Sequence, residues 1–131
     1  MGQPAAKQGD AVTGMCVHII LVPSPGGPVP TPIPHPFNGI LSGALSADVK
    51  VMGMPVAVLG STADNTPPHV PMGPGPFQVP PRNKATIITG SPTVMVNNKP
   101  MARLSDTALI CADPTDIPAG QVIGVGTVFV A

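Results

Sequence analysis

The sequence predicts an all-β fold, and three features of its composition support this prediction. All six acidic residues are aspartates, so glutamate, one of the better helix formers, is absent. Valine, isoleucine and threonine dominate the apolar runs, and these residues favour the pleated surface of a sheet. Twenty prolines and 15 glycines mark turns at short intervals along the chain. Short strands joined by many tight turns are therefore expected.

The composition also bounds the number of domains and excludes some functions. The 131 residues suffice for one domain with a modest core, so we interpret 1–131 as a single domain. Disordered chains are usually poor in apolar residues and rich in charge, whereas this chain is 43% hydrophobic and 9% charged. Its formal net charge of zero provides no basic stripe, and we expect no nucleic-acid partner.

The chain carries no recognisable signal for membrane insertion or secretion. No apolar run approaches the roughly 20 residues that a transmembrane helix needs. The apolar segment 15–22 is broken by His18 and is followed directly by prolines, which does not fit a secretory signal. We therefore expect a protein made in the cytoplasm that, if it leaves the cell, is exported by another route.

An internal repeat is the strongest feature of the sequence. The segment SADVKVMGMPVAVLGSTA (46–63) overlays SPTVMVNNKPMARLSDTA (91–108) without a gap, at a constant offset of 45 residues. Each copy predicts a β-hairpin with alternating valines in its first strand and a proline at the start of its return strand. The turns of the two hairpins are expected at 52–53 and at 97–98.

The two ends of the chain together resemble a third copy of this hairpin. Residues 127–130 match the first strand of the repeat, and residues 4–10 match its return strand through proline, a small residue, a basic residue and aspartate. We therefore expect the N- and C-terminal strands to pair, with residues 128–130 opposite residues 5–7. A closed ring of three hairpins would leave no unpaired edge.

Two segments between the hairpins are rich in proline. Residues 22–37 read VPSPGGPVPTPIPHPF, and residues 64–82 read DNTPPHVPMGPGPFQVPPR. Such segments favour a stiff, extended backbone close to polyproline II. We expect both to be loops, and neither to be a central strand.

The candidate metal ligands occupy related places in the repeat. His18 and His69 each lie eight residues after the aspartate position of their copy, and Cys111 lies five residues after it. A threefold ring would bring these side chains to one axis, where His35 on the first proline-rich segment is the obvious fourth ligand. Three imidazoles and one thiolate form the closed tetrahedral set that structural zinc prefers. The competing interpretation of each histidine alone is a surface or core residue without a metal.

The second cysteine has two possible uses. Cys16 lies two residues before His18, so its side chain either shares a face with that ligand or is buried as a small hydrophobe. A disulfide between Cys16 and Cys111 competes with metal binding. Because a chain without a secretion signal folds in a reducing cytoplasm, metal is favoured over a disulfide.

Catalysis is not expected. Four protein ligands leave a zinc ion no free position for water, and the chain has no glutamate to act as a general base. It also contains no nucleophile, metalloprotease or phosphate-loop motif.

The motif Pro4-Ala5-Ala6-Lys7 with its following aspartate, the split hairpin and the His/Cys set together resemble the PAAR-repeat family. Lysine stands here where the family pattern has arginine, and the copy at 55–61 lacks both the basic residue and the aspartate, with Ser61 in its place. The resemblance implies a small, pointed, three-sided β-structure. It also implies zinc near the vertex, with iron as the second choice of ion, on the ligands His18, His35, His69 and Cys111.

The resemblance also implies a function and partners. Members of the family cap the homotrimeric, VgrG-like spike of contractile injection systems, with one tip chain for each trimer. A tip of this kind would leave the cell with the particle, contact the target membrane transiently and help to pierce the target envelope. An adaptor that attaches effector cargo to the spike is the alternative. The long proline-rich segment 22–37 looks more like the tips of extracellular phage-tail-like particles than like those of type VI secretion.

Overall fold

A computed structural model of the chain describes residues 2–113 and 115–130, and the predicted all-β fold is confirmed. The described residues contain no helix, so none of them forms a helix long and apolar enough to cross a membrane. The strands of the described residues are β1 (Gln3–Pro4), β2 (Ala11–Val22), β3 (Val29–Gly43), β4 (Lys50–Val51), β5 (Met54–Pro55), β6 (Thr62–Asn65), β7 (Lys84–Ile87), β8 (Met95–Val96), β9 (Lys99–Pro100), β10 (Thr107–Ile110), β11 (Ile117–Ile123) and β12 (Phe129–Val130).

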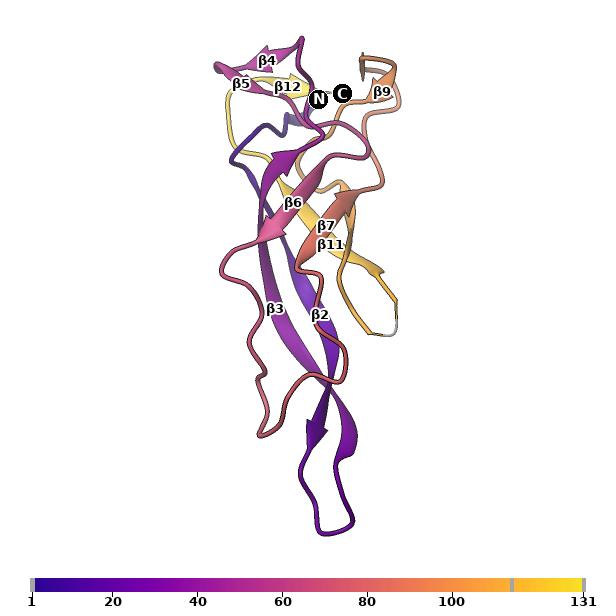
Figure 1. Cartoon of the computed structure of the whole chain (residues 1–131). Helices are drawn as coiled ribbons and strands as arrows, with labels where there is room; N and C mark the ends of the chain where they lie inside the picture. Colours follow the sequence, from indigo (N-terminus) through magenta and orange to yellow (C-terminus); the bar gives the residue numbers. More distant parts are fainter. Residues whose placement is uncertain (1, 114, 131) are drawn as a thin grey trace.

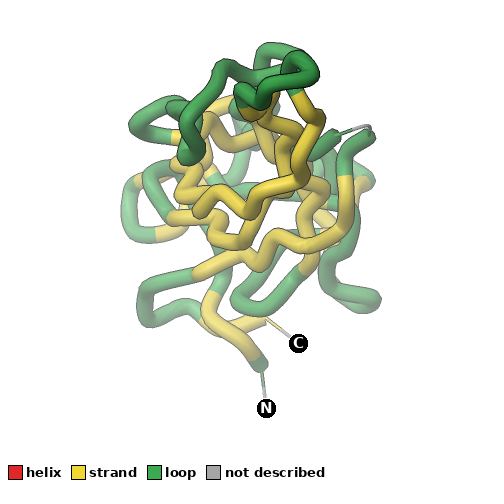
Figure 2. The backbone as a smooth tube through the Cα atoms, turned by 90° about the horizontal axis from the view of Figure 1, so that it is seen from below, coloured by secondary structure: helices red, strands yellow, loops and turns green. Residues whose placement is uncertain are grey.

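Three hairpins form the body of the molecule. β2–β3, β6–β7 and β10–β11 are antiparallel hairpins that join edge to edge into a closed sheet in the order β10-β11-β2-β3-β6-β7. The strands surround the long axis when the molecule is seen from below (Figure 2). Their inward side chains are mainly aliphatic, and together with Phe37 they form the core around Val12, Leu41, Ile87, Ile110 and Val122.

Three short hairpins form the wide end of the molecule, drawn at the top of Figure 1. Two of them, β4–β5 and β8–β9, are the predicted hairpins of the repeat. Their turns have positive φ at both central residues, Met52-Gly53 and Asn97-Asn98, as type I′ turns require. The third pairs β1 with β12, so the prediction that the terminal strands pair is confirmed.

The predicted register of the terminal strands is correct only in part. Gln3 lies opposite Val130, and the N–H of Ala5 donates to the carbonyl of Val128 at 2.8 Å. Lys7, however, pairs with Val56 of another hairpin. The chain leaves the terminal ladder after Ala5 because the next residues belong to a ring that joins all three copies.

This ring of hydrogen bonds is formed by the third residue of each four-residue motif, which begins with proline. The N–H of Ala6 donates to Ala102, that of Ala102 to Ala57, and that of Ala57 to Ala6, at 3.0, 2.9 and 2.9 Å. The three alanine side chains are fully buried. The cyclic exchange gives the chain an internal threefold arrangement, and it explains why a small residue recurs at this position.

The turn after each motif is held by a side-chain oxygen. The N–H of Lys7 donates to Asp10 at 3.2 Å, and that of Arg103 donates to Asp106 at 2.8 Å. In the atypical copy the N–H of Val58 donates to the hydroxyl of Ser61 at 2.9 Å. Serine therefore replaces aspartate without loss of the turn, and an uncharged Ser61 needs no basic partner at position 58.

The first proline-rich segment differs from the predicted loop. Residues 29–36 continue β3 and pair with β2 as far as Val22↔Val29, so only residues 23–28 form a turn at the narrow end (Figure 1). Prolines 30, 32, 34 and 36 occupy the alternate positions of β3 at which an N–H group would point away from β2. Their lack of an N–H therefore removes no hydrogen bond from the β2–β3 ladder. β3 meets β6 only from Gly39 onward, and the segment is thus not a central strand.

Candidate metal centre

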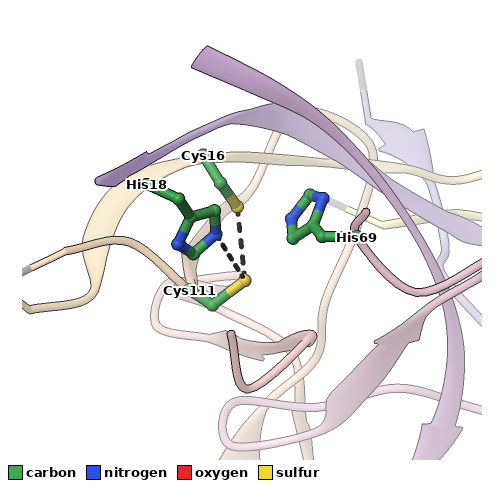
Figure 3. A group of neighbouring side chains, drawn as sticks. All are labelled: Cys16, His18, His69 and Cys111. Atoms are coloured by element: carbon green, nitrogen blue, oxygen red, sulfur yellow. Dashed lines mark hydrogen bonds between the residues drawn. The ribbon is translucent and has the colours of Figure 1, made fainter. Parts of the chain in front are cut away.

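The candidate metal centre lies where the three large hairpins approach one another below the core. Cys16 and His18 come from β2, His69 from the loop between β6 and β7, and Cys111 directly follows β10. One ligand atom from each of these four side chains lies within 4.8 Å of all the others. Figure 3 shows the four side chains pointing toward one another. The repeat thus brings His18, His69 and Cys111 together, and Cys16 occupies the fourth place.

The distances in this group suit a tetrahedral ion. The Sγ atoms of Cys16 and Cys111 are 3.4 Å apart, and Cys111 Sγ is 3.7 Å from Nε2 of His18. Zinc bonds of about 2.3 Å to sulfur and about 2.0 Å to nitrogen set tetrahedral edges of roughly 3.8 Å between two sulfurs and roughly 3.6 Å between sulfur and nitrogen. Neither cysteine forms a disulfide in this arrangement.

Two buried nitrogens at the centre have no hydrogen-bond partner among the described residues, Nε2 of His69 and Nδ1 of His18. Buried polar atoms are rarely left without a partner, and a bound metal would satisfy the first. Nδ1 of His18 lies 3.6 Å from a carboxylate oxygen of Asp113, which is too long for a hydrogen bond. A carboxylate behind the far nitrogen of a histidine is a common support for a metal ligand. The residues present therefore fit a metal ion.

His35, the fourth ligand that the sequence predicts, lies outside this group. Its Nδ1–H donates to the carbonyl of Ile33 at 2.8 Å, and its Nε2 accepts from the N–H of Met72 at 3.1 Å. Both ring nitrogens are engaged, and the side chain is fully buried 5.4 Å from His18 between ring centroids. His35 fastens the loop that carries His69 to β3.

Cys16 and His35 are direct neighbours across the β2–β3 ladder. This explains how Cys16 comes to lie at the place expected of His35. The sequence did contain a signal for Cys16. Residues two apart on a strand point to the same face, so a strand that presents His18 inward also presents Cys16 inward.

The electrostatics of the group favour a thiolate at Cys111. The Cys16 thiol donates a hydrogen bond to Cys111, and with the contact from His18 this lowers the pKa of Cys111 to about 5 despite burial. The same hydrogen bond, together with burial, raises the pKa of Cys16. Burial lowers the pKa of His69 and so favours its neutral, metal-binding form. One thiolate beside the neutral imidazole of His69 is a site ready to bind a cation.

The loop 66–83 encloses the centre from the side. Phe77 pairs with Ile20 of β2, and its ring centroid lies 5.6 Å from that of His18 and 5.4 Å from that of His35. The loop approaches β2 closely at Gly75, where an added Cβ would meet the carbonyl oxygen of Leu21 at 1.7 Å. The donors are therefore held in a largely dry environment, which suits a structural ion.

Comparison with known proteins now adds to this geometry. No curated protein matches the chain. A family model described as the PAAR motif matches residues 21–108, which is more than half of the 131 residues. The match spans the two gap-free repeats, the loop with His69 and all of β3. The chain therefore belongs to the PAAR-motif family.

Proposed function

We propose that this protein is a metal-pinned tip that caps the trimeric spike of a contractile injection system and helps it to pierce a target envelope. Membership of the PAAR-motif family supports the role of a spike tip. The observation that carries the proposal is the convergence of Cys16, His18, His69 and Cys111 from three hairpins within 4.8 Å. We further propose that the chain is made in the cytoplasm and leaves the cell as part of the particle.

The metal would act as a structural pin. Zinc held by four protein donors has no open position, so it would join the three hairpins and activate no water. The fold needs such a pin because its core contains few large side chains: Phe37 is the only buried aromatic residue among the described parts of the chain. The binding energy of a structural metal counts directly toward folding. We accordingly propose a role without catalysis.

The wide end suits a trimeric partner. The three short hairpins surround the alanine ring, so one chain presents three similar edges to three identical subunits. Phe129 and Met95 occupy equivalent places in two of the hairpins and are 61% and 56% exposed. Lys50 takes this place in the third hairpin, with exposed Met52 and Met54 beside it. Exposed apolar side chains gathered at one end are typical of a covered surface.

The experiment is to mix the purified chain with the trimeric spike protein of its own system and to measure the mass of the complex. We expect one tip chain for three spike chains. A tip that forms its own trimer, or that does not bind the spike, would refute the proposal.

A second candidate, an adaptor for effector cargo, has one observation in its favour. A hollow of about 460 Å³ on the flank of the sheet is lined by Arg82, Lys84, Thr86 and Asp116, none of which belongs to the group of candidate metal ligands. A double variant, Arg82→Ala with Asp116→Ala, tests this role. Normal capping of the spike with loss of cargo delivery would support the adaptor, and unchanged delivery would exclude this surface.

A further inference from the structure

The narrow end of the molecule has an unusual surface, which we call the apex. It consists of residues 19–34 in the β2–β3 hairpin and residues 70–79 of the loop that packs on it. Neither segment contains a lysine, arginine, aspartate or glutamate, and the charge-free sequence extends on both sides to 11–47 and 65–81. All twelve charged residues of the chain lie outside these ranges. Exposed protein surfaces normally carry interspersed charges, so their absence here needs an explanation.

The exposed side chains of the apex are mainly apolar, and Ser24 and Gln78 are the two exposed polar ones. Val29, Val70, Met72 and Val79 are 48–69% exposed, and nine prolines lie among them. The two hydroxyl groups of the hairpin do not need water as an acceptor. Ser24 donates to the carbonyl of Gly27, and Thr31 donates to the carbonyl of Val29 at 3.2 Å.

The backbone donors of the apex are also removed or paired. Prolines 30, 32 and 34 delete the N–H groups on the outer edge of β3. On the outer edge of β2, the N–H of Ile19 donates to Asp113 at 3.0 Å and the N–H of Leu21 donates to Pro76 at 2.9 Å. An unpaired N–H is expensive in hydrocarbon, so the removal or pairing of these edge N–H groups lowers the free-energy cost of moving the apex out of water.

We propose that the apex enters the hydrocarbon interior of a lipid bilayer, through apolar contact alone and without recognition of charged head groups. This inference rests on the proposed function and names the surface that the tip presents to a target. A protein partner fits the apex less well. Strand addition needs edge N–H groups, which the prolines remove from the outer edge of β3, and protein interfaces carry a polar rim, whereas the apex has only Ser24 and Gln78 as exposed polar side chains. Because the apex has no charge, its binding to vesicles is expected to be independent of anionic lipid and of salt.

The chain contains no tryptophan, so the fluorescence of a single introduced tryptophan reports only on the surroundings of the substituted position. The probes are Val29→Trp and Met72→Trp in the apex. The control is Val125→Trp near the wide end, where the native side chain is 62% exposed. Each metal-loaded full-length variant is mixed with zwitterionic phosphatidylcholine vesicles whose acyl chains are brominated near the bilayer centre. We expect a blue shift and quenching for both apex probes and neither for Val125→Trp, with no change on adding anionic lipid or salt.

A charged residue in the apex provides the matched test. Adding Val29→Lys to the Met72→Trp variant is expected to weaken partition into the vesicles by about tenfold or more, because a charge is costly in hydrocarbon. Absence of quenching at both apex sites in folded protein, equal quenching at Val125→Trp, or a requirement for anionic lipid would each overturn the inference. Capping of the spike is measured on the same variants. Normal capping without insertion refutes the apex inference alone, whereas loss of capping in the unmodified chain refutes the proposed function.

Discussion

Cys16 and Cys111 lie with their Sγ atoms 3.4 Å apart, although 95 positions separate them in the chain. The contact joins β2 to the end of β10, and His69 reaches the same point from the third hairpin. The three large hairpins are thus joined along their edges in the closed sheet and meet again at this His/Cys group nearer the narrow end.

The first prediction distinguishes the candidate metal ligands from His35, which lies beside them. Cys16→Ala, His69→Ala and Cys111→Ala should each abolish stoichiometric metal binding and lower the free energy of unfolding by more than about 3 kcal/mol, because metal binding is linked to folding. His35→Ala should keep the metal, although it loses the packing of a buried ring and the hydrogen bonds to Ile33 and Met72. Elemental analysis and denaturant unfolding of the purified variants give both quantities. Metal retained by Cys16→Ala but lost by His35→Ala would contradict this assignment.

The second prediction concerns the pH dependence of the metal-free protein. The pKa of Cys111 is about 5 in the folded chain, compared with an ordinary value of 9.0. Between these values the unfolded chain binds more protons than the folded one, so the free energy of unfolding should rise with pH. The lowered pKa of His69 acts in the same direction around its ordinary value of 6.5.

Urea unfolding of chelator-treated protein at several pH values between 5 and 9 measures this slope. Cys111→Ser is the control, since serine does not titrate in this range, and its slope should be clearly smaller. The same slope in both proteins would show that Cys111 is not a thiolate in the folded chain.

The third prediction tests the alanine ring. Ala57 is fully buried where the three motifs exchange hydrogen bonds, so Ala57→Val should overpack the site and destabilise the protein by about 1–3 kcal/mol. Ala47→Val, at an exposed position of the same repeat, is the matched control and should change stability by less than about 0.5 kcal/mol. Equal effects of the two variants in denaturant unfolding would count against the ring as a packed element.

The fourth prediction separates folding from capping at the closing strand. Val130 is 4% exposed and packs in the second apolar cluster, whereas its neighbour Phe129 is 61% exposed. Val130→Ala should therefore lower the free energy of unfolding by about 1.5–3 kcal/mol. Phe129→Ala should leave stability unchanged and weaken binding to the spike. Calorimetry of the chain and titration against the spike measure the two effects, and a destabilised Phe129→Ala would place that side chain in the core.

The sequence was sufficient to predict the hairpins of the wide end because the repeat that encodes them recurs at a constant offset. Two copies overlay without a gap, and each carries a turn and a proline at the same place, so the missing third copy was identified from fragments at both chain ends. The positions of His18, His69 and Cys111 relative to the repeat likewise indicated them as candidate metal ligands. Their contact depends on the threefold arrangement, which a repeat encodes directly.

Other features depend on contacts that no repeat encodes. The proline-rich part of β3 was predicted as a loop because proline opposes strands, but at an unpaired edge alternate prolines delete only N–H groups that have no ladder partner. His35 resembled a ligand because its residue type is right. Its two backbone hydrogen bonds arise from Ile33 beside it and from Met72 on another loop, and only the folded chain reveals them.

X-ray absorption at the zinc edge of the purified, metal-loaded protein tests the central claim most directly, because it counts sulfur and nitrogen donors around the ion. The group Cys16, His18, His69 and Cys111 predicts two sulfur donors at about 2.3 Å and two nitrogen donors at about 2.0 Å. One sulfur with three nitrogens would restore His35 as the ligand in place of Cys16. The absence of bound metal, or a shell containing a water oxygen, would contradict the structural pin altogether.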